Sequence, residues 1–150
     1  MIETIDPSER EERNLAVLAH LSAVISGFVV PFGNIAGPLI MYFSYRDKKP
    51  LVAQHAKASL NFQITMTIVA IMLIIAALVV YAILLVTVVA GSSDAGKPTP
   101  LSTGALIGIF AVVIACVAFF VWTFVQNILA AVAASKGRTY RYPLAREFVK

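Results

Sequence analysis

Charged side chains are scarce in this sequence and missing from long parts of it. Only 13% of the residues are charged and 59% are hydrophobic, whereas soluble domains average about 25% and about 45–50%. Neither Ile64–Ala90 nor Gly104–Ala134 contains a charge. A soluble protein of 150 residues could not hide so much apolar surface, because small domains bury only part of their chain. The composition therefore excludes a soluble domain and predicts an integral membrane protein.

Cysteine and catalytic patterns are equally scarce. Cys116 is the single cysteine, which excludes an intrachain disulfide and a paired-cysteine metal site. His20 and His55 have no metal-ligand spacing around them. The sequence has no Ser/His/Asp arrangement, no paired intramembrane carboxylates and no phosphate-binding glycine loop. We therefore expect a protein that is not an enzyme and that needs no cofactor or metal.

The two uncharged runs are long enough to cross a bilayer. As helices they measure about 40 and about 46 Å at about 1.5 Å per residue, and a hydrocarbon core is about 30 Å thick. Residues 15–45 are also apolar, but Pro31–Asn34 and Pro38 interrupt them. These residues favour a turn between two short helices, with one long kinked span as the alternative. We predict an all-α membrane protein with four helical segments, a short N-terminal hairpin plus two long spans, in which the second hairpin arm is short enough to be re-entrant.

Positive charge predicts the orientation. Basic residues gather at 46–57 and after residue 135, whereas the loop at 91–103 carries one. Because cytoplasmic loops are enriched in Lys and Arg, we expect the two basic segments inside and the loop outside. The hairpin then places the N-terminus inside too, and a kinked span would place it outside. The residues expected to contact anionic lipid headgroups and to set the topology are Arg46, Lys48, Lys49, Lys57, Lys136, Arg138, Arg141 and Arg146.

The predicted organisation is an acidic cytoplasmic segment at 1–13, a membrane bundle at 14–146 and a basic end at 147–150. A basic tail directly after a span is typical of lipid contact, so no nucleic-acid partner is expected. In that tail, Gly137 is predicted to be a left-handed helix cap. Tyr140 and Tyr142 are interpreted, with the neighbouring arginines, as an interfacial anchor.

An interfacial amphipathic helix is predicted to begin near Pro50 and to lead into the third membrane segment. Val52, Ala56 and Leu60 are expected to face the membrane, whereas His55 is expected to face water or lipid headgroups. A pH-sensitive or partner-binding role for His55 is the alternative, because imidazole titrates near neutrality.

Several polar residues of the predicted membrane segments form a candidate interhelical or partner-binding cluster. Its members are His20, His55, Asn61, Gln63, Gln126 and Asn127. Interhelical amide hydrogen bonds are worth about 0.6–2 kcal/mol in membranes, so these residues are interpreted as contacts that fix the helix register. A polar translocation path or ligand pocket is the alternative. Asn61 and Gln63 lie about 200° apart on a helix, so they should face different neighbours.

A row of small residues marks one face of the last apolar run. Gly104, Gly108, Ala111 and Ala115 recur at spacings of four and three residues. Small residues let membrane helices approach closely, so this row is interpreted as a helix-packing face, within one chain or between chains.

Three stretches together resemble a known family. They are "LAHLSAV…PFGNIAGPLI", "RDKKPLVAQHAKASLNFQ" and "AAVAASKGRTYRYPL". These stretches are similar to small bacterial multispanning membrane proteins of unknown function that include the magnetosome MamF-like proteins, and distantly to an inner-envelope subunit of the chloroplast protein-import machinery. The resemblance covers about residues 14–146. It implies a four-segment helical bundle in the bacterial inner membrane with both termini inside, and no known enzymatic activity.

We therefore interpret the chain as a non-enzymatic scaffold or accessory subunit of a membrane complex. Its expected partners are membrane lipids with anionic headgroups and either a second copy of the chain or another membrane protein. The alternative is a transport or protein-translocation component whose polar residues line a path through the membrane.

Overall fold

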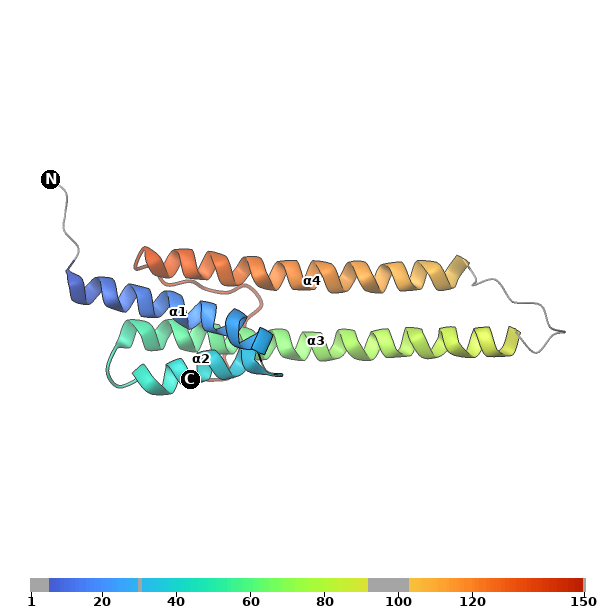
Figure 1. Cartoon of the computed structure of the whole chain (residues 1–150), viewed down its shortest axis with the longest axis horizontal. Helices are drawn as coiled ribbons and strands as arrows, with labels where there is room; N and C mark the ends of the chain where they lie inside the picture. The colour runs from blue at the N-terminus through green and yellow to red at the C-terminus, as the bar shows by residue number, and fades with distance from the viewer. Residues whose placement is uncertain (1–5, 30, 92–102, 150) are drawn as a thin grey trace. The chain divides into compact units, whose positions relative to one another are not determined.

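Helices form nearly all of the described structure. The computed structural model describes residues 6–29, 31–91 and 103–149, and confirms an all-α chain. Its elements are α1 (Pro7–Val29), α2 (Gly33–Tyr45), α3 (Pro50–Gly91) and α4 (Thr103–Ser135), shown in Figure 1. The loop predicted to lie outside the membrane falls, except for its two ends, beyond the described residues.

The chain folds as two compact units. The first unit comprises residues 1–67 and 122–150, and the second comprises residues 68–121. Helices α3 and α4 each contribute one part to each unit. Every contact described below lies inside one unit.

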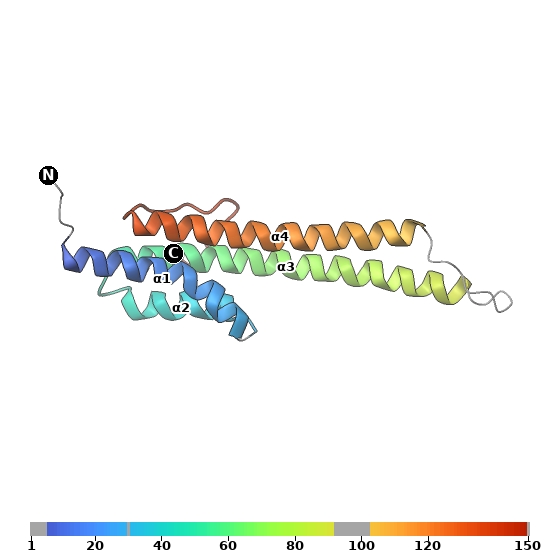
Figure 2. The ribbon, with the colours of Figure 1, turned by 45° about the horizontal axis from the view of Figure 1, so that its top comes forward.

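Helices α1 and α2 form a hairpin, which decides between the two predicted arrangements of residues 15–45 (Figures 1 and 2). At the turn Phe32 has a left-handed φ of 60°, and its carbonyl accepts hydrogen bonds from the Ile35 and Ala36 amides. The Ser26 hydroxyl donates to the Gly33 carbonyl across the hairpin. A Cβ on Gly37 would lie 2.6 Å from the Ser22 carbonyl oxygen, so this glycine permits the close approach of the two arms.

The second arm is too short to cross a bilayer. Helix α2 has 13 residues, which gives a length of about 20 Å against a hydrocarbon core of about 30 Å. Pro38 lies inside α2 without ending it.

Helix α3 is continuous from Pro50 to Gly91, so the predicted interfacial helix and third membrane segment are one element. Val52, Ala56 and Leu60 are buried against protein. The prediction that they face the membrane is wrong, because α1, α2 and the C-terminal tail supply an apolar interior for the first unit.

Helix α4 ends in the predicted left-handed cap. Gly137 has a φ of 66°. Its amide donates to the Ala134 carbonyl at 2.9 Å, and the Arg138 amide donates to the Ala133 carbonyl at 3.0 Å. This pair of bonds is the Schellman arrangement, which satisfies the last carbonyls of a helix. The Arg13 guanidinium of α1 lies against Gly137, where a Cβ would be 3.1 Å from Nε.

Two of the described helices are long and apolar enough to cross a membrane. The qualifying segments are Pro50–Val89 and Leu106–Ser135, so the structure supports two spans of the four segments predicted. Within the second unit, the α3 part measures about 36 Å and the α4 part about 29 Å at about 1.5 Å per residue. Their large apolar side chains are mostly exposed, as lipid-facing side chains are in an isolated chain.

The small-residue row makes little contact inside the second unit. A Cβ on Gly108 would lie 3.5 Å from Val80 of α3, whereas one on Gly104 would meet nothing within 4 Å. Ala111 and Ala115 are exposed. Within one chain, therefore, only Gly108 of the four lies close to α3.

Candidate functional site

A buried network of polar side chains joins all four helices and the C-terminal tail of the first unit. Its members are His20 of α1, Asn34 of α2, His55 and Gln63 of α3, Asn127 of α4 and Tyr142 of the tail. Four of the six belong to the candidate cluster. Asn34 and Tyr142 were not assigned to it, because "PFGN" indicates a turn and "YRY" after a span indicates an interfacial anchor.

The two histidines and the tyrosine form one arm of the network. His55 Nδ1 lies 2.9 Å from His20 Nε2, and His20 Nδ1 lies 2.9 Å from the Tyr142 hydroxyl. The hydroxyl in turn donates to Oδ1 of Asn127 at 3.3 Å. Since the hydroxyl has one proton, His20 must donate to it from Nδ1 and accept from His55 at Nε2. Neutral side chains therefore account for each hydrogen bond of this arm.

The amide side chains form the second arm. Gln63 Nε2 donates to Asn127 Oδ1 at 3.0 Å, so this oxygen accepts from both α3 and the tail. Asn34 Nδ2 donates to Gln63 Oε1 at 3.4 Å and to the Thr67 hydroxyl at 3.0 Å. The amide of Asn127 is fixed by its own bond to the Thr123 carbonyl. These bonds hold three helices at a common level.

Tyr142 is a core residue, which corrects its interpretation as an interfacial anchor. Its ring stacks on Phe62 with centroids 4.1 Å apart and planes 13° apart. Only 5% of the residue is exposed, and this burial raises the pKa of the Tyr142 hydroxyl. The tail therefore folds into the bundle instead of lying along lipid headgroups at this position.

His55 is also placed differently from the expectation. It is 1% exposed, so the interpretation that it contacts water or headgroups is wrong. The reason is that α1 covers this face of α3 and places His20 against it, with the two rings edge to face. His55 Nε2 has no hydrogen-bond partner among the described residues. Because a neutral His55 donates from Nδ1, its Nε2 is unprotonated and is an acceptor.

Two members of the candidate cluster bind the tail instead of another helix. Asn61 Oδ1 accepts from the amides of Phe148 and Val149 at 3.0 and 2.8 Å, and its Nδ2 donates to the Val149 carbonyl at 3.2 Å. Gln126 Oε1 accepts from the Tyr140 hydroxyl at 2.5 Å. Asn61 and Gln63 therefore face different neighbours, as their angular separation predicts.

The basic residues predicted to contact headgroups lie on the surface of the first unit. Lys49 donates to Glu11 at 2.9 Å, which joins the start of α3 to the start of α1. This hydrogen bond raises the pKa of Lys49. Arg46 is 3.1 Å from Asp47, and its guanidinium lies over the Phe43 ring. Whether any of them binds lipid stays a prediction.

The network can hold elements together but has few reactive groups. It contains no carboxylate or thiol, and within the described ranges no three His, Cys, Asp or Glu side chains are grouped to hold a metal ion. Buried polar groups that are fully paired rigidify a bundle and specify one arrangement of its helices.

The chain is helical, two of its described helices can cross a membrane, and a buried polar network joins its helices. These features define a membrane protein of the helical-bundle class. The chain belongs to the magnetosome magnetite crystal formation protein family (MamF_MmsF), whose profile matches residues 11–149. This match confirms the resemblance to MamF-like proteins, and the distant similarity to the chloroplast import subunit stays a prediction. The chain has no significant match among curated proteins or among solved structures.

Proposed function

We propose that this chain is a non-enzymatic scaffold or accessory subunit of a complex in the bacterial inner membrane, with both termini in the cytoplasm. The observation that carries the proposal is that the polar side chains of the first unit pair with one another and with the tail. They stabilise a fixed shape, whereas the second unit exposes apolar side chains that need lipid or another protein as a neighbour.

The lengths of the helices support two complete crossings. The parts of α3 and α4 within the second unit measure about 36 and about 29 Å, which matches a core of about 30 Å. The charged tail bonds to Asn61 and Thr65, so α3 is flanked by charged residues up to Thr65. We therefore place the start of the crossing just after Thr67.

The hairpin of α1 and α2 then contacts the membrane without crossing it. Asn34, directly after the turn, bonds to Thr67, so the turn lies level with the start of the α3 crossing. Phe28 and Phe32 at the turn are 75% and 68% exposed. Four segments thus meet the membrane and two cross it, with the hairpin as a shallow re-entrant element.

The orientation rests on positive charge. The Lys49–Glu11 bond joins the start of α3 to the start of α1, and Arg13 of α1 lies against Gly137 at the end of α4. These three helix ends therefore lie at one end of the first unit. The basic residues at 46–49 and 136–138 lie there. Because Lys and Arg are enriched on the cytoplasmic side, this end belongs in the cytoplasm.

The proposed partner is a second copy of the chain or another membrane protein. The exposed face of α4 that carries Ala111 and Ala115 has small residues, which allow close helix contact. The description of the family, which concerns the formation of magnetite crystals in magnetosomes, supports a role in an assembly process on a membrane. The transport alternative has less support, because Asn61 and Gln126 are occupied by the tail.

Crosslinking in the membrane tests the proposal. A photo-crosslinking residue at Val117 of the second unit, 58% exposed, should give a discrete protein adduct that mass spectrometry identifies as a second copy or as one other protein. The matched control at Ser8, exposed on α1, should give no such adduct. Lipid adducts alone at Val117, together with a monomer in mild detergent, would overturn the scaffold role.

A further inference from the structure

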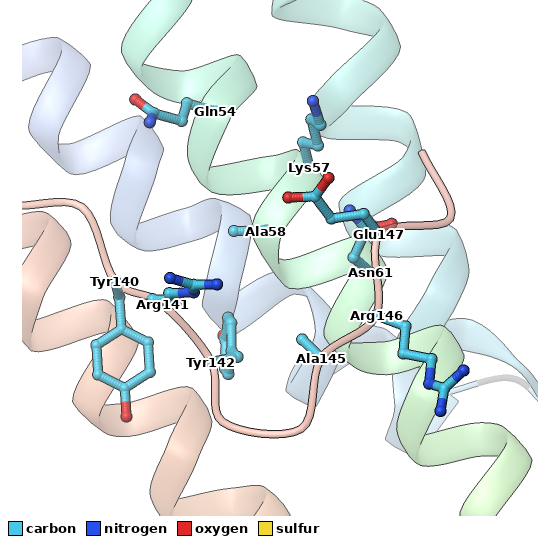
Figure 3. Close-up of a pocket in the computed structure, with 10 residues that line it drawn as sticks. All are labelled: Gln54, Lys57, Ala58, Asn61, Tyr140, Arg141, Tyr142, Ala145, Arg146 and Glu147. Atoms are coloured by element: carbon cyan, nitrogen blue, oxygen red, sulfur yellow. The ribbon is translucent and has the colours of Figure 1, made fainter. Parts of the chain in front are cut away.

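The first unit contains a cavity of about 440 Å³ between α3 and the C-terminal tail (Figure 3). Its polar lining residues are Gln54, Lys57, Asn61, Arg141, Arg146 and Glu147. A cavity of this volume falls in the range of small-molecule sites, which is roughly 300–1,000 Å³. It lies outside the buried network, although Asn61 and Tyr142 form part of its wall.

The cavity collects positive charge that its one carboxylate neutralises only in part. Lys57, Arg141 and Arg146 line it with one carboxylate, that of Glu147. The ion pairs of the described residues involve Arg13, Arg46 and Lys49, so none of the three cavity cations has a carboxylate within 4.0 Å. Like charges held around one space repel one another unless an anion or water lies between them.

The fold of the tail brings these cations together. Arg141 precedes Tyr142, whose ring is fixed on Phe62, and the Arg146 amide is bonded to the Thr65 hydroxyl at 3.1 Å. The tail reverses between these two anchors, where Leu144 has a left-handed φ of 66°. In Figure 3 the Arg141 guanidinium and the Glu147 carboxylate point toward the central space, whereas the Lys57 ammonium points upward past Glu147 and the Arg146 guanidinium extends away.

We propose that this cavity binds the phosphate group of a phospholipid headgroup, with Lys57 and Arg141 as its principal ligands. Guanidinium groups match phosphate oxygens in pairs, and lysine supplies a compact point charge. Arg146 adds positive charge at the rim, and Glu147 opposes the anion. The site differs from diffuse attraction of a basic surface, because it depends on two particular cations that line one partly open cavity.

The position on α3 favours a lipid over a soluble phosphate compound. Lys57 and Asn61 lie one to two turns before Ile64, where the uncharged run begins. Under the proposed function, which this step requires, the crossing starts just after Thr67, so Lys57 and Asn61 lie on the headgroup side of the boundary, about 9 to 15 Å from it along α3. A phospholipid there can reach the cavity with its phosphate while its chains stay in the bilayer.

Native mass spectrometry of the full chain in an uncharged detergent, with added phosphatidylglycerol, tests the site. The Lys57→Gln/Arg141→Gln variant should bind the lipid about 10-fold or more weakly, because both charge-assisted contacts to the phosphate, which are stronger than neutral hydrogen bonds, are lost. The matched control is Lys136→Gln/Arg138→Gln, which removes the same charge from residues that lie outside the cavity and can attract headgroups only as an exposed basic surface. Its binding should stay within about 2-fold, since exposed charges add little. Glu147→Gln should bind more tightly, because it removes the opposing carboxylate.

Three outcomes would overturn the proposal. Equal losses in the two double variants would indicate attraction to the surface as a whole. Weaker binding by Glu147→Gln would indicate that the carboxylate contributes to lipid binding, as an acceptor for the headgroup hydroxyls, and does not oppose the anion. Calorimetric binding of glycerol 3-phosphate as tight as that of the lipid would assign the site to soluble phosphate compounds. Circular dichroism melting of each variant checks that the fold is intact. Loss of the lipid site leaves the Val117 adduct unchanged, so the failure of this proposal is distinguishable from failure of the scaffold role.

Discussion

The hydroxyl of Tyr142 lies 2.9 Å from Nδ1 of His20, although the two residues are 122 positions apart in the sequence. This contact joins the last segment of the chain to the first helix, and Asn127 extends it to α4. The bundle of the first unit is therefore complete only when the tail has folded back. Its stability depends on a segment that composition alone places outside the bundle.

Removing the Tyr142 hydroxyl should destabilise the first unit. Tyr142→Phe keeps the stacking on Phe62 but leaves Nδ1 of His20 without its buried partner and removes one of the two hydrogen bonds to Asn127 Oδ1. An unpaired buried polar atom costs about 1–3 kcal/mol. Unfolding in a titration with sodium dodecyl sulfate measures the loss. Tyr81→Phe is the control, because Tyr81 is exposed and its change should cost less than about 0.5 kcal/mol. Equal effects of the two changes would contradict a structural role for the network.

The same residue should make the fold sensitive to alkaline pH. Burial raises the pKa of Tyr142, whereas a tyrosine in the unfolded chain ionises near about 10. Above that pH the unfolded state loses the proton and the folded state keeps it, so stability falls as pH rises, by at most about 1.4 kcal/mol per pH unit. Thermal melting from about pH 9 to about pH 11 measures the decline. Tyr142→Phe should flatten it, and an unchanged slope in that variant would rule out Tyr142 as the cause.

Asn61 should control the order of the last residues. Asn61→Ala removes three hydrogen bonds to Phe148 and Val149, so their amides should exchange with deuterium about 10-fold faster or more, since the tail opens more easily. Thr65→Val is the matched change. Within the tail the Thr65 hydroxyl accepts only from the Arg146 amide, and its other bond, to the Asn61 carbonyl, lies inside α3. Of the tail amides, only that of Arg146 should therefore exchange faster. If Asn61→Ala speeds exchange along α3 instead, its role is in the helix and not in the tail.

The helices could be predicted from the sequence because local patterns determine them. The residues Pro31, Gly33 and Asn34 predict the turn of the hairpin, although the left-handed residue there is Phe32. The end of α4 follows from Gly137, whose left-handed φ glycine adopts freely. The exclusion of charge from Ile64–Ala90 likewise indicates a membrane helix before any contact is known.

The site could be predicted only in part, because its partners are remote. The spacing of Asn61 and Gln63 indicated that they face different neighbours, but which neighbours depends on the path of the tail. His55 follows a basic segment, a position typical of an interfacial residue, and it is the packing of α1 that buries it. Tyr142 has a position typical of a headgroup anchor, and its burial depends on Phe62, 80 residues earlier. Long-range packing of this kind leaves no local pattern.

The close approach of α1 and α2 should not tolerate a side chain at Gly37. A Cβ there would lie 2.6 Å from the Ser22 carbonyl oxygen, which belongs to the backbone and cannot easily move. Gly37→Ala should therefore cost about 1–3 kcal/mol from overpacking, reduced by up to about 1 kcal/mol from better helix propensity. Gly104→Ala is the control, because a Cβ there meets nothing within 4 Å. Thermal melting should show a lower midpoint for Gly37→Ala alone.

The depth of the hairpin turn can be measured with a fluorescent residue. Phe32→Trp, in a chain whose native Trp122 is replaced by Phe, places the indole at the exposed turn. A shallow re-entrant hairpin predicts stronger quenching by bromines near the headgroups than by bromines deep in the acyl chains. Tyr45→Trp in the same background is the control. Tyr45 lies at the other end of α2, about 20 Å away. The indole of Tyr45→Trp should be quenched neither by bromines near the headgroups nor by bromines deep in the acyl chains. Strongest quenching of Phe32→Trp by deep bromines would mean that the hairpin enters the hydrocarbon core, and the membrane boundary would then lie before Asn61 on α3.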